Sequence, residues 1–255
     1  MCILFIANDQ HPNYPLIIAA NRDEFYNRPT KASGYWGDSN ILAGKDLEAG
    51  GTWMGITKSG HIAALTNYRD PKNNQDDAPS RGALVSEYLL KPTPNYSEYL
   101  YMNGRKYNGF NLLYGHWQSL SVFGNTTLTS EEIKQGFYGL SNADLNTPWP
   151  KLTTGIRQIA DYCTSQDDII TDDLLDVLSD NTRAPDDKLP NTGIPFEWEK
   201  ALSSIFINLE GYGTRSSTVL LIDKEQQVTW HERCFNAQAQ TNAEHKYYFR
   251  IKESD

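Results

Sequence analysis

The sequence opens on Cys2-Ile-Leu-Phe-Ile-Ala7, and a second apolar run, Leu16-Ile-Ile-Ala-Ala20, leads directly into Asn21-Arg-Asp-Glu24. Both runs are short and apolar, a pattern typical of strands buried on both faces. The residues between them are rich in Asn, Asp and Pro, so we predict a β-hairpin that turns near His11. In that hairpin the residue opposite Cys2 falls within the segment from Asn21 to Asp23.

The rest of the chain alternates hairpins with separate helices. Paired strands are predicted on either side of a turn at residues 58–60, and again at residues 107–114 and 120–123. Helices are predicted at residues 80–90, 130–133, 148–162 and 167–178. Hairpins outnumber βαβ units, which favours an α+β fold of antiparallel sheets over a Rossmann-type sheet. We see no internal repeat or long linker, so we expect a single domain over residues 1–255.

Composition excludes several classes of function. The chain has 255 residues and a formal net charge of −9, which argues against a nucleic-acid partner. No window approaches the roughly 20 consecutive apolar residues of a transmembrane segment. Three cysteines without a CxxC pair fit a reducing cytosol, so we expect a cytoplasmic protein.

Several familiar catalytic motifs are absent from the sequence. It holds no phosphate-binding P-loop, no HExxH zinc motif and no GxSxG nucleophile elbow. The five histidines show no metal-ligand spacing, so we predict no metal site. The segment His231-Glu-Arg-Cys234 holds too few ligands to close a site, and we interpret it as a surface strand end.

Cys2 is the residue whose position suggests chemistry. If Met1 is removed, the Cys2 thiol lies beside a free α-amino group with a pKa of about 7.7–8.0, which could act as a general base. Arg22 and Asp23, predicted opposite Cys2, would supply a cation that lowers the thiol pKa and a carboxylate that orients the amine. The alternative is a buried structural cysteine that begins a core strand, with residues 21–24 as a charged strand end.

A dense set of motifs covers the first 70 residues, and shorter ones follow. They include Ala19-Ala-Asn-Arg-Asp-Glu-Phe-Tyr26, Gly50-Gly-Thr-Trp53, Leu65-Thr-Asn-Tyr-Arg69, Gly139-Leu-Ser-Asn142 and Gly213-Thr-Arg-Ser-Ser217. Together they closely resemble the NRDE family, also called the Transport and Golgi organisation protein 2 family, which is named for its Asn-Arg-Asp-Glu motif.

The resemblance implies a fold and a reaction. The family is similar to N-terminal nucleophile hydrolases of the cysteine branch, which contains penicillin V acylase and bile-salt hydrolase. That fold is a four-layer αββα sandwich of antiparallel sheets. The reaction it implies is hydrolysis of a small amide by attack of the Cys2 thiol, through an acyl-thioester, with no cofactor required.

Carried over motif by motif, the resemblance also implies roles for individual residues. Asp23 would orient the amine, Asn67 and Asn142 would bind the oxyanion, and Arg215 would flank Cys2. Supporting residues would be Asn21, Arg22 and Glu24.

One departure concerns the strand before Asp23. The acylases place an arginine three residues before this aspartate, where the present chain has Ala20. Neighbouring strand residues face opposite sides, so we expect Arg22 to point away from the thiol. The oxyanion residues also have ordinary alternatives, because Asn67 could cap a strand end and Asn142 could form an Asx-turn.

The resemblance implies a second class of function as well, namely a non-catalytic protein that binds haem or lipid during intracellular trafficking. The sequence has no haem motif, and His61 is the candidate axial ligand. The alternative for His61 is that it simply begins a strand after the turn at residues 58–60. In both classes the partner is a small molecule.

Overall fold

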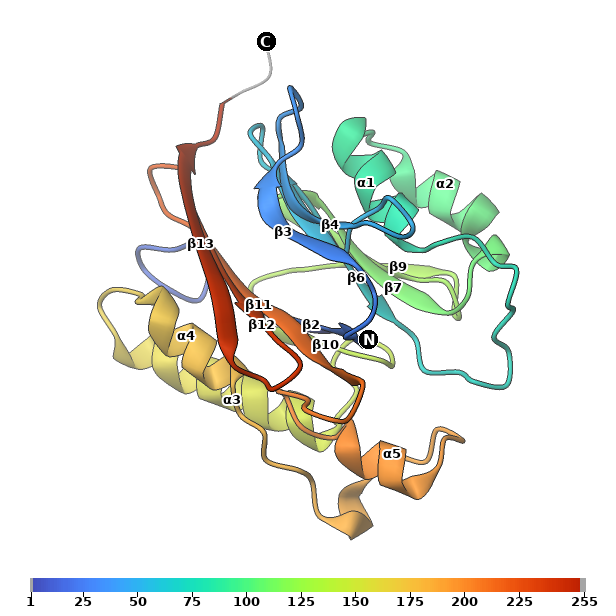
Figure 1. Cartoon of the computed structure of the whole chain (residues 1–255). Helices are drawn as coiled ribbons and strands as arrows, with labels where there is room; N and C mark the ends of the chain where they lie inside the picture. Colours follow the sequence, from blue (N-terminus) through green and yellow to red (C-terminus); the bar gives the residue numbers. More distant parts are fainter. Residues whose placement is uncertain (1, 253–255) are drawn as a thin grey trace. The chain divides into compact units, whose positions relative to one another are not determined.

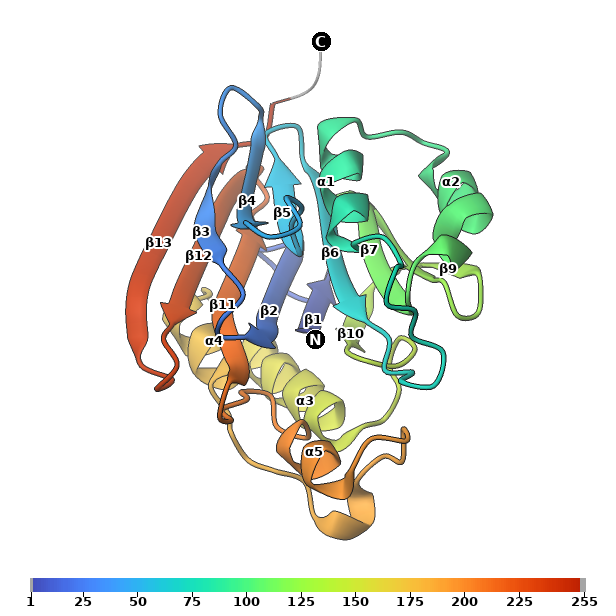
Figure 2. The same cartoon turned by 45° about the vertical axis from the view of Figure 1, so that its right-hand side comes forward.

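The computed structural model describes residues 2–252. Their backbone contacts group into two compact units, and each unit has an antiparallel sheet of its own (Figures 1 and 2). The first unit comprises residues 2–27, 134–141 and 145–249. The second unit comprises residues 28–133, 142–144 and 250–252.

The sheet of the first unit has six strands in the order β10-β1-β2-β11-β12-β13. Their bounds are Cys2–Asn8 (β1), Leu16–Phe25 (β2), Gly136–Leu140 (β10), Tyr212–Ile222 (β11), Gln227–Phe235 (β12) and Thr241–Arg250 (β13). The predicted hairpin is confirmed, because β1 and β2 pair antiparallel with Cys2 directly opposite Arg22. The whole Asn21–Glu24 segment continues β2, and it pairs on its other side with β11.

Helices cover one face of this sheet. They are Pro150–Ser165 (α3) and Thr171–Leu178 (α4), and a 3-10 turn at Asp186–Lys188 and the short helix Phe196–Ala201 (α5) follow them in the chain. Figure 1 shows α3 and α4 side by side across the strands, where Phe5 and Val219 pack against apolar residues of both helices. The approach is close at Gly155 of α3, where a Cβ would overlap the ring of Phe5.

The sheet of the second unit has seven strands that follow one another in chain order. Their bounds are Thr30–Tyr35 (β3), Ile41–Asp46 (β4), Met54–Thr57 (β5), His61–Asn67 (β6), Phe110–His116 (β7), Ser119–Gly124 (β8) and Thr129–Glu132 (β9). Its helices are Gly82–Leu90 (α1) and Tyr96–Asn103 (α2), followed by a 3-10 turn at Gly104–Lys106. Figure 2 shows α1 lying along β5 and β6, and a core that includes Tyr88, Leu100 and Phe123 joins both helices to the sheet.

One predicted element is wrong. Residues 130–133 were expected to form a short helix capped by Ser130, but Thr129–Glu132 is strand β9, which pairs antiparallel with β8. The hydrogen bonds of the ladder outweigh a local capping signal of a few tenths to about 2 kcal/mol. In the described residues no helix is long and apolar enough to cross a membrane.

Candidate active site

Cys2 is the first residue of β1 and is buried. Its carbonyl oxygen accepts a hydrogen bond from the Ser141 hydroxyl at 3.4 Å. Burial raises the pKa of the thiol, and the Asp23 carboxylate raises it further, while Arg22 and the backbone N–H of Asp23 act in the opposite direction. The lowered thiol pKa expected from the sequence is therefore wrong, because loss of hydration outweighs the neighbouring cation.

Arg22 lies on the same face of the sheet as Cys2. The two residues are direct cross-strand partners, and such partners project their side chains to one side. The Arg22 side chain is buried, and its charge acts on the Cys2 thiol. The expectation that Arg22 points away from the thiol is therefore wrong. That argument compared Arg22 only with its chain neighbour Asp23, whereas the register of the hairpin decides which residue faces Cys2.

Asp23 is buried and held by a chain of hydrogen bonds from β11. The Thr214 hydroxyl donates to Asp23 Oδ1 at 2.7 Å, and it accepts in turn from the Ile207 backbone N–H at 2.9 Å. Burial raises the pKa of Asp23 to about 6, although the charge of Lys151 and the hydrogen bond from Thr214 both act to lower it. A carboxyl group with this pKa is mostly ionised at pH 7 and can still exchange a proton near neutrality.

Lys151, which the sequence reasoning missed, is the buried cation that acts on Asp23. It is the second residue of α3, only 4% exposed, and its Nζ donates to the Leu202 carbonyl at 3.1 Å. A signal was present in the sequence, because Lys151 falls four residues before Gly155 and eight before Ile159 on the buried face of an amphipathic helix. A lysine at such a position needs a partner or a polar group.

Asn21 has a structural role. Its Nδ2 donates to the carbonyl oxygens of Leu178 at 2.8 Å and Ile205 at 3.0 Å, and its Oδ1 accepts from the Ser217 hydroxyl at 2.6 Å. These bonds tie β2 to the end of α4 and to β11. The hydrogen bonds of the Asn21 side chain therefore stabilise the fold, and the side chain lies on the helix-covered side of the sheet.

Arg215 and Glu24 lie beside the same stretch of β2. The pairing of β11 with β2 shifts register between Thr214 and Ser216, and Arg215 is the residue inserted at that bulge. Its guanidinium donates to the Phe25 carbonyl at 2.8 Å, and burial followed by the charge of Arg22 lowers its pKa. Glu24 accepts a hydrogen bond from the Phe25 backbone N–H, and its negative charge acts to raise the pKa of Arg215. The structure thus places Arg215 next to the Arg22–Asp23 segment within the first unit.

Asn67 and Asn142 lie together in the second unit. Asn142 Nδ2 donates to the Asn67 carbonyl at 3.0 Å, and the Asn142 carbonyl accepts from the Arg69 backbone N–H at 2.8 Å. Asn142 is buried, whereas Asn67 ends strand β6 and is half-buried. Two residues 75 positions apart in the sequence are thereby joined at the end of one strand.

His61 begins β6 directly opposite His116 of β7. The two ring centroids are 5.4 Å apart, and the Ser59 hydroxyl lies 3.3 Å from Nδ1 of His61. Burial lowers the pKa of both imidazoles, and the proximity of His116 lowers that of His61 further. Both rings are therefore neutral at pH 7.

The segment from His231 to Cys234 is not the surface strand end that the sequence predicted, since the side chains of His231 and Glu232 are fully buried. His231 Nε2 is 2.7 Å from Glu244, and Nδ1 is 2.8 Å from the Thr171 hydroxyl. Asp172, His231 and Glu244 could together present ligand atoms to a metal ion. However, the Arg233 guanidinium bridges both carboxylates, at 2.8 Å from Asp172 and 3.2 Å from Glu244, so their charge already has a cation.

The comparison with solved structures identifies the fold. The chain superimposes on the C2A mutant of conjugated bile acid hydrolase from Clostridium perfringens with a TM-score of 0.52, covering 100% of this chain and 98% of that one, at 8% identity. The predicted α+β class of the N-terminal nucleophile hydrolase type is therefore confirmed.

Sequence comparison identifies the family. A model described as Transport and Golgi organisation 2 matches residues 1–237. The mouse (Mus musculus) Transport and Golgi organization 2 homolog is 37% identical over 256 residues, which cover 91% of this chain and 92% of that protein. Drosophila melanogaster Transport and Golgi organization protein 2 is 30% identical, with 91% of each chain covered. The chain belongs to the Transport and Golgi organisation 2 family.

Proposed function

We propose that this protein is a cysteine amidohydrolase in which Cys2 attacks the carbonyl carbon of a small acylated amine. The observation that carries the proposal is the pairing of Cys2 with the Arg22–Asp23 segment, in which the backbone N–H of Asp23 and the charge of Arg22 act on the thiol. A nearby cation favours the thiolate that acts as the nucleophile, and a buried carboxylate can orient the general base that takes the thiol proton. The N-terminal nucleophile hydrolase fold supports the same class of chemistry.

The proposed reaction has two steps. After removal of Met1, which lies outside the described residues, the α-amino group of Cys2 takes the thiol proton and the sulfur attacks the carbonyl carbon. The amide C–N bond then breaks, the leaving amine takes that proton, and the acyl group remains on sulfur as a thioester. Water attacks the thioester, releases a carboxylic acid and restores the thiol.

Asp23 is the group that we assign to the α-amine. Its carboxylate is fixed by Thr214 and kept largely ionised at pH 7 by Lys151. An ionised, immobile carboxylate favours one orientation of the amine and stabilises its protonated form during the reaction.

Asn67 and Asn142 are proposed as oxyanion donors on the basis of the family resemblance. Their amide groups are suitable donors for a tetrahedral oxyanion. Removal of one such donor lowers kcat by about 10²–10³-fold in other hydrolases. The variant Asn142→Ala should therefore reduce turnover strongly with little change in KM.

The decisive experiment combines analysis of the N-terminus with an activity assay. Mass spectrometry of the purified protein should show loss of Met1, and a panel of acyl amides that differ in acyl chain and amine should yield at least one substrate. Cys2→Ala should abolish its turnover, and Cys163→Ala should leave it unchanged as a matched control. A retained Met1, or equal turnover by Cys2→Ala, would contradict the proposal.

A second candidate function is haem binding by His61. The observation in its favour is the neutral His61–His116 pair, because a neutral imidazole nitrogen is a common axial ligand of haem iron. When bound, haem would supply its own iron coordination chemistry, and the chain would contribute the imidazole ligand. Haem titration followed in the Soret band tests this function independently of Cys2.

We also propose that the protein acts in the cytoplasm and has no nucleic-acid partner. Cys2, Cys163 and Cys234 are all free thiols, as expected in a reducing compartment, and the net charge of −9 disfavours contact with phosphate backbones.

A further inference from the structure

Strand β9 lies at the edge of the second unit's sheet. Among the described strands it pairs only with β8. Just beyond β9, the backbone N–H of Ile133 donates to the Leu120 carbonyl at 2.8 Å. In an antiparallel strand the backbone N–H and C=O groups of alternate residues point to the same neighbouring strand, so those of Thr129 and Glu131 also point to β8. The backbone N–H and C=O groups of Ser130 and Glu132 therefore point outward, away from the sheet.

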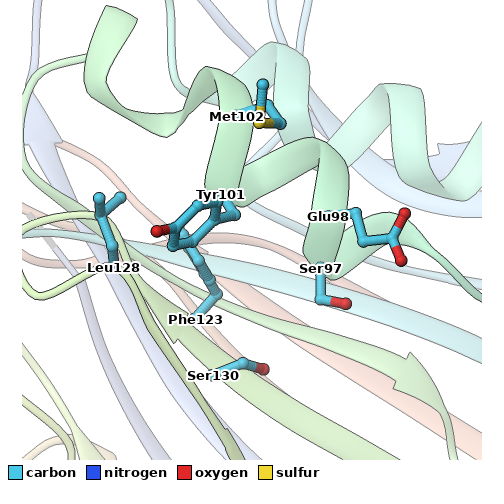
Figure 3. Close-up of a pocket in the computed structure, with 7 residues that line it drawn as sticks. All are labelled: Ser97, Glu98, Tyr101, Met102, Phe123, Leu128 and Ser130. Atoms are coloured by element: carbon cyan, nitrogen blue, oxygen red, sulfur yellow. The ribbon is translucent and has the colours of Figure 1, made fainter.

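An apolar groove adjoins this edge. It lies between α2 and the β8–β9 hairpin and has a volume of about 490 Å³. Figure 3 shows Tyr101 above Phe123, with Leu128 to one side and Ser130 beneath. Tyr101 and Met102 are 59% and 75% exposed, which is high for large apolar side chains that adjoin a hydrophobic core.

The groove lies on the face toward which Ser130 points. The Ser130 hydroxyl is 3.2 Å from the Tyr114 hydroxyl, and Tyr114 belongs to the core beneath α1 and α2. A residue that pairs with Ser130 from outside the sheet would project its side chain to the same face. That side chain would enter the groove, whereas its two chain neighbours would project to the opposite face.

Acidic groups surround this edge. Glu98 lies on the rim of the groove, and Glu131 and Glu132 are two of the four residues of β9, all of which are exposed. Within residues 2–252 these three carboxylates have no ion-pair partner. A partner that approaches this edge therefore meets an unneutralised negative charge.

We propose that the β9 edge binds an extended basic peptide segment of a partner protein, which adds to the sheet as an eighth strand. Backbone hydrogen bonds to Ser130 and Glu132 would hold the segment, and an apolar residue would enter the groove between Tyr101 and Leu128. The lysine or arginine residues on either side would project to the opposite face, where one of them lies across from Glu131, and the charge of Glu132 adds to the attraction along the edge. Addition of a strand to a free sheet edge is an established mode of peptide recognition, in which pockets for alternate side chains give specificity.

The test uses the full-length protein and a fluorescent peptide, acetyl-Lys-Val-Lys-Val-Lys-Val-Lys-amide, with binding measured by fluorescence anisotropy. Ser130→Pro removes the outward N–H without removing any bond to β8, and proline is tolerated at edge strands. Loss of this bond and of the fit around it should weaken binding about tenfold. Ser130→Ala, the matched control, loses the same hydroxyl but keeps the N–H, and it should bind within about twofold of wild type.

Charge reversal provides a second arm that does not depend on proline. The double variant Glu131→Lys with Glu132→Lys should lose affinity for the lysine peptide and gain affinity for its glutamate counterpart. Circular dichroism and thermal melting confirm that each variant is folded. Binding by Ser130→Pro equal to wild type would overturn the proposal. If Ser130→Pro bound like wild type and Tyr101→Ala abolished binding, the groove would hold an apolar ligand without strand addition, and this result would also overturn the proposal.

Discussion

The Thr214 hydroxyl donates a 2.7 Å hydrogen bond to the Asp23 carboxylate, and both residues are almost completely buried. The bond joins the centre of the Asn-Arg-Asp-Glu motif to the Gly213–Ser217 segment nearly two hundred positions later in the chain. It exists because β2 and β11 are neighbours in the sheet, with Asp23 opposite Thr214. Two motifs that are far apart in the sequence therefore form one buried polar cluster.

We expect Asp23 to make the stability of the protein depend on pH. Folding raises the Asp23 pKa from 3.8 to about 6, so the folded state holds this proton more tightly than the unfolded chain. The stabilising contribution is therefore present below pH 3.8 and is lost as the pH rises through about 6. A difference of this size corresponds to about 3 kcal/mol between the two ends of that range.

Urea unfolding at several pH values measures this effect. Between pH 4 and 7 the free energy of unfolding of Asp23→Asn should fall less steeply than that of wild type, because the variant has no proton to lose at this position. Parallel curves for the two proteins would show that Asp23 is not desolvated in the folded state.

Lys151 should control the ionisation of Asp23. Replacement by methionine removes a buried positive charge, so the pKa of Asp23 should rise further and the acidic limb of the activity profile should move to higher pH. Lys151→Arg keeps the charge and should retain the wild-type limb. A loss of activity at all pH values, with the limb unmoved, would assign Lys151 to the packing of α3 alone.

The sequence predicted interactions between segments that are close together in the chain better than interactions between distant ones. The hairpin followed from the two apolar runs, which also limited the residue opposite Cys2 to the segment from Asn21 to Asp23; the pairing with Arg22 came from the structure. The partnership of Lys151 with Asp23 did not follow, because the two residues are far apart in the sequence and come together only when α3 packs across the sheet. The same reason explains strand β9, whose local sequence resembles a capped helix start but whose hydrogen bonds come from β8. The single domain expected over residues 1–255 stays a prediction.

Cys2 should be the most reactive of the three cysteines, although burial raises its pKa. Only Cys2 has both a cation, Arg22, and a backbone N–H that act to lower its thiol pKa. Burial alone raises the pKa of Cys163 to about 11, and Glu232 adds to the effect of burial at Cys234. Timed iodoacetamide labelling at neutral pH with peptide mapping should show Cys2 modified first. If Cys234 reacts before Cys2, then Cys2 is a structural thiol and the proposed nucleophile is wrong.

His61 separates the two candidate functions. We rank the hydrolase first, so we expect His61→Ala to leave any haem binding largely intact, because His61 is explained by its place at the start of β6 after the turn at residues 58–60. His116→Ala serves as the matched control, since the two rings are neighbours and burial lowers the pKa of both. Titration should be followed in the Soret band, where a real site saturates near one equivalent and non-specific adsorption does not. Loss of the Soret shift in His61→Ala, with saturation retained in Cys2→Ala, would make haem binding the primary function, because the ligand would then be the imidazole and not the thiolate.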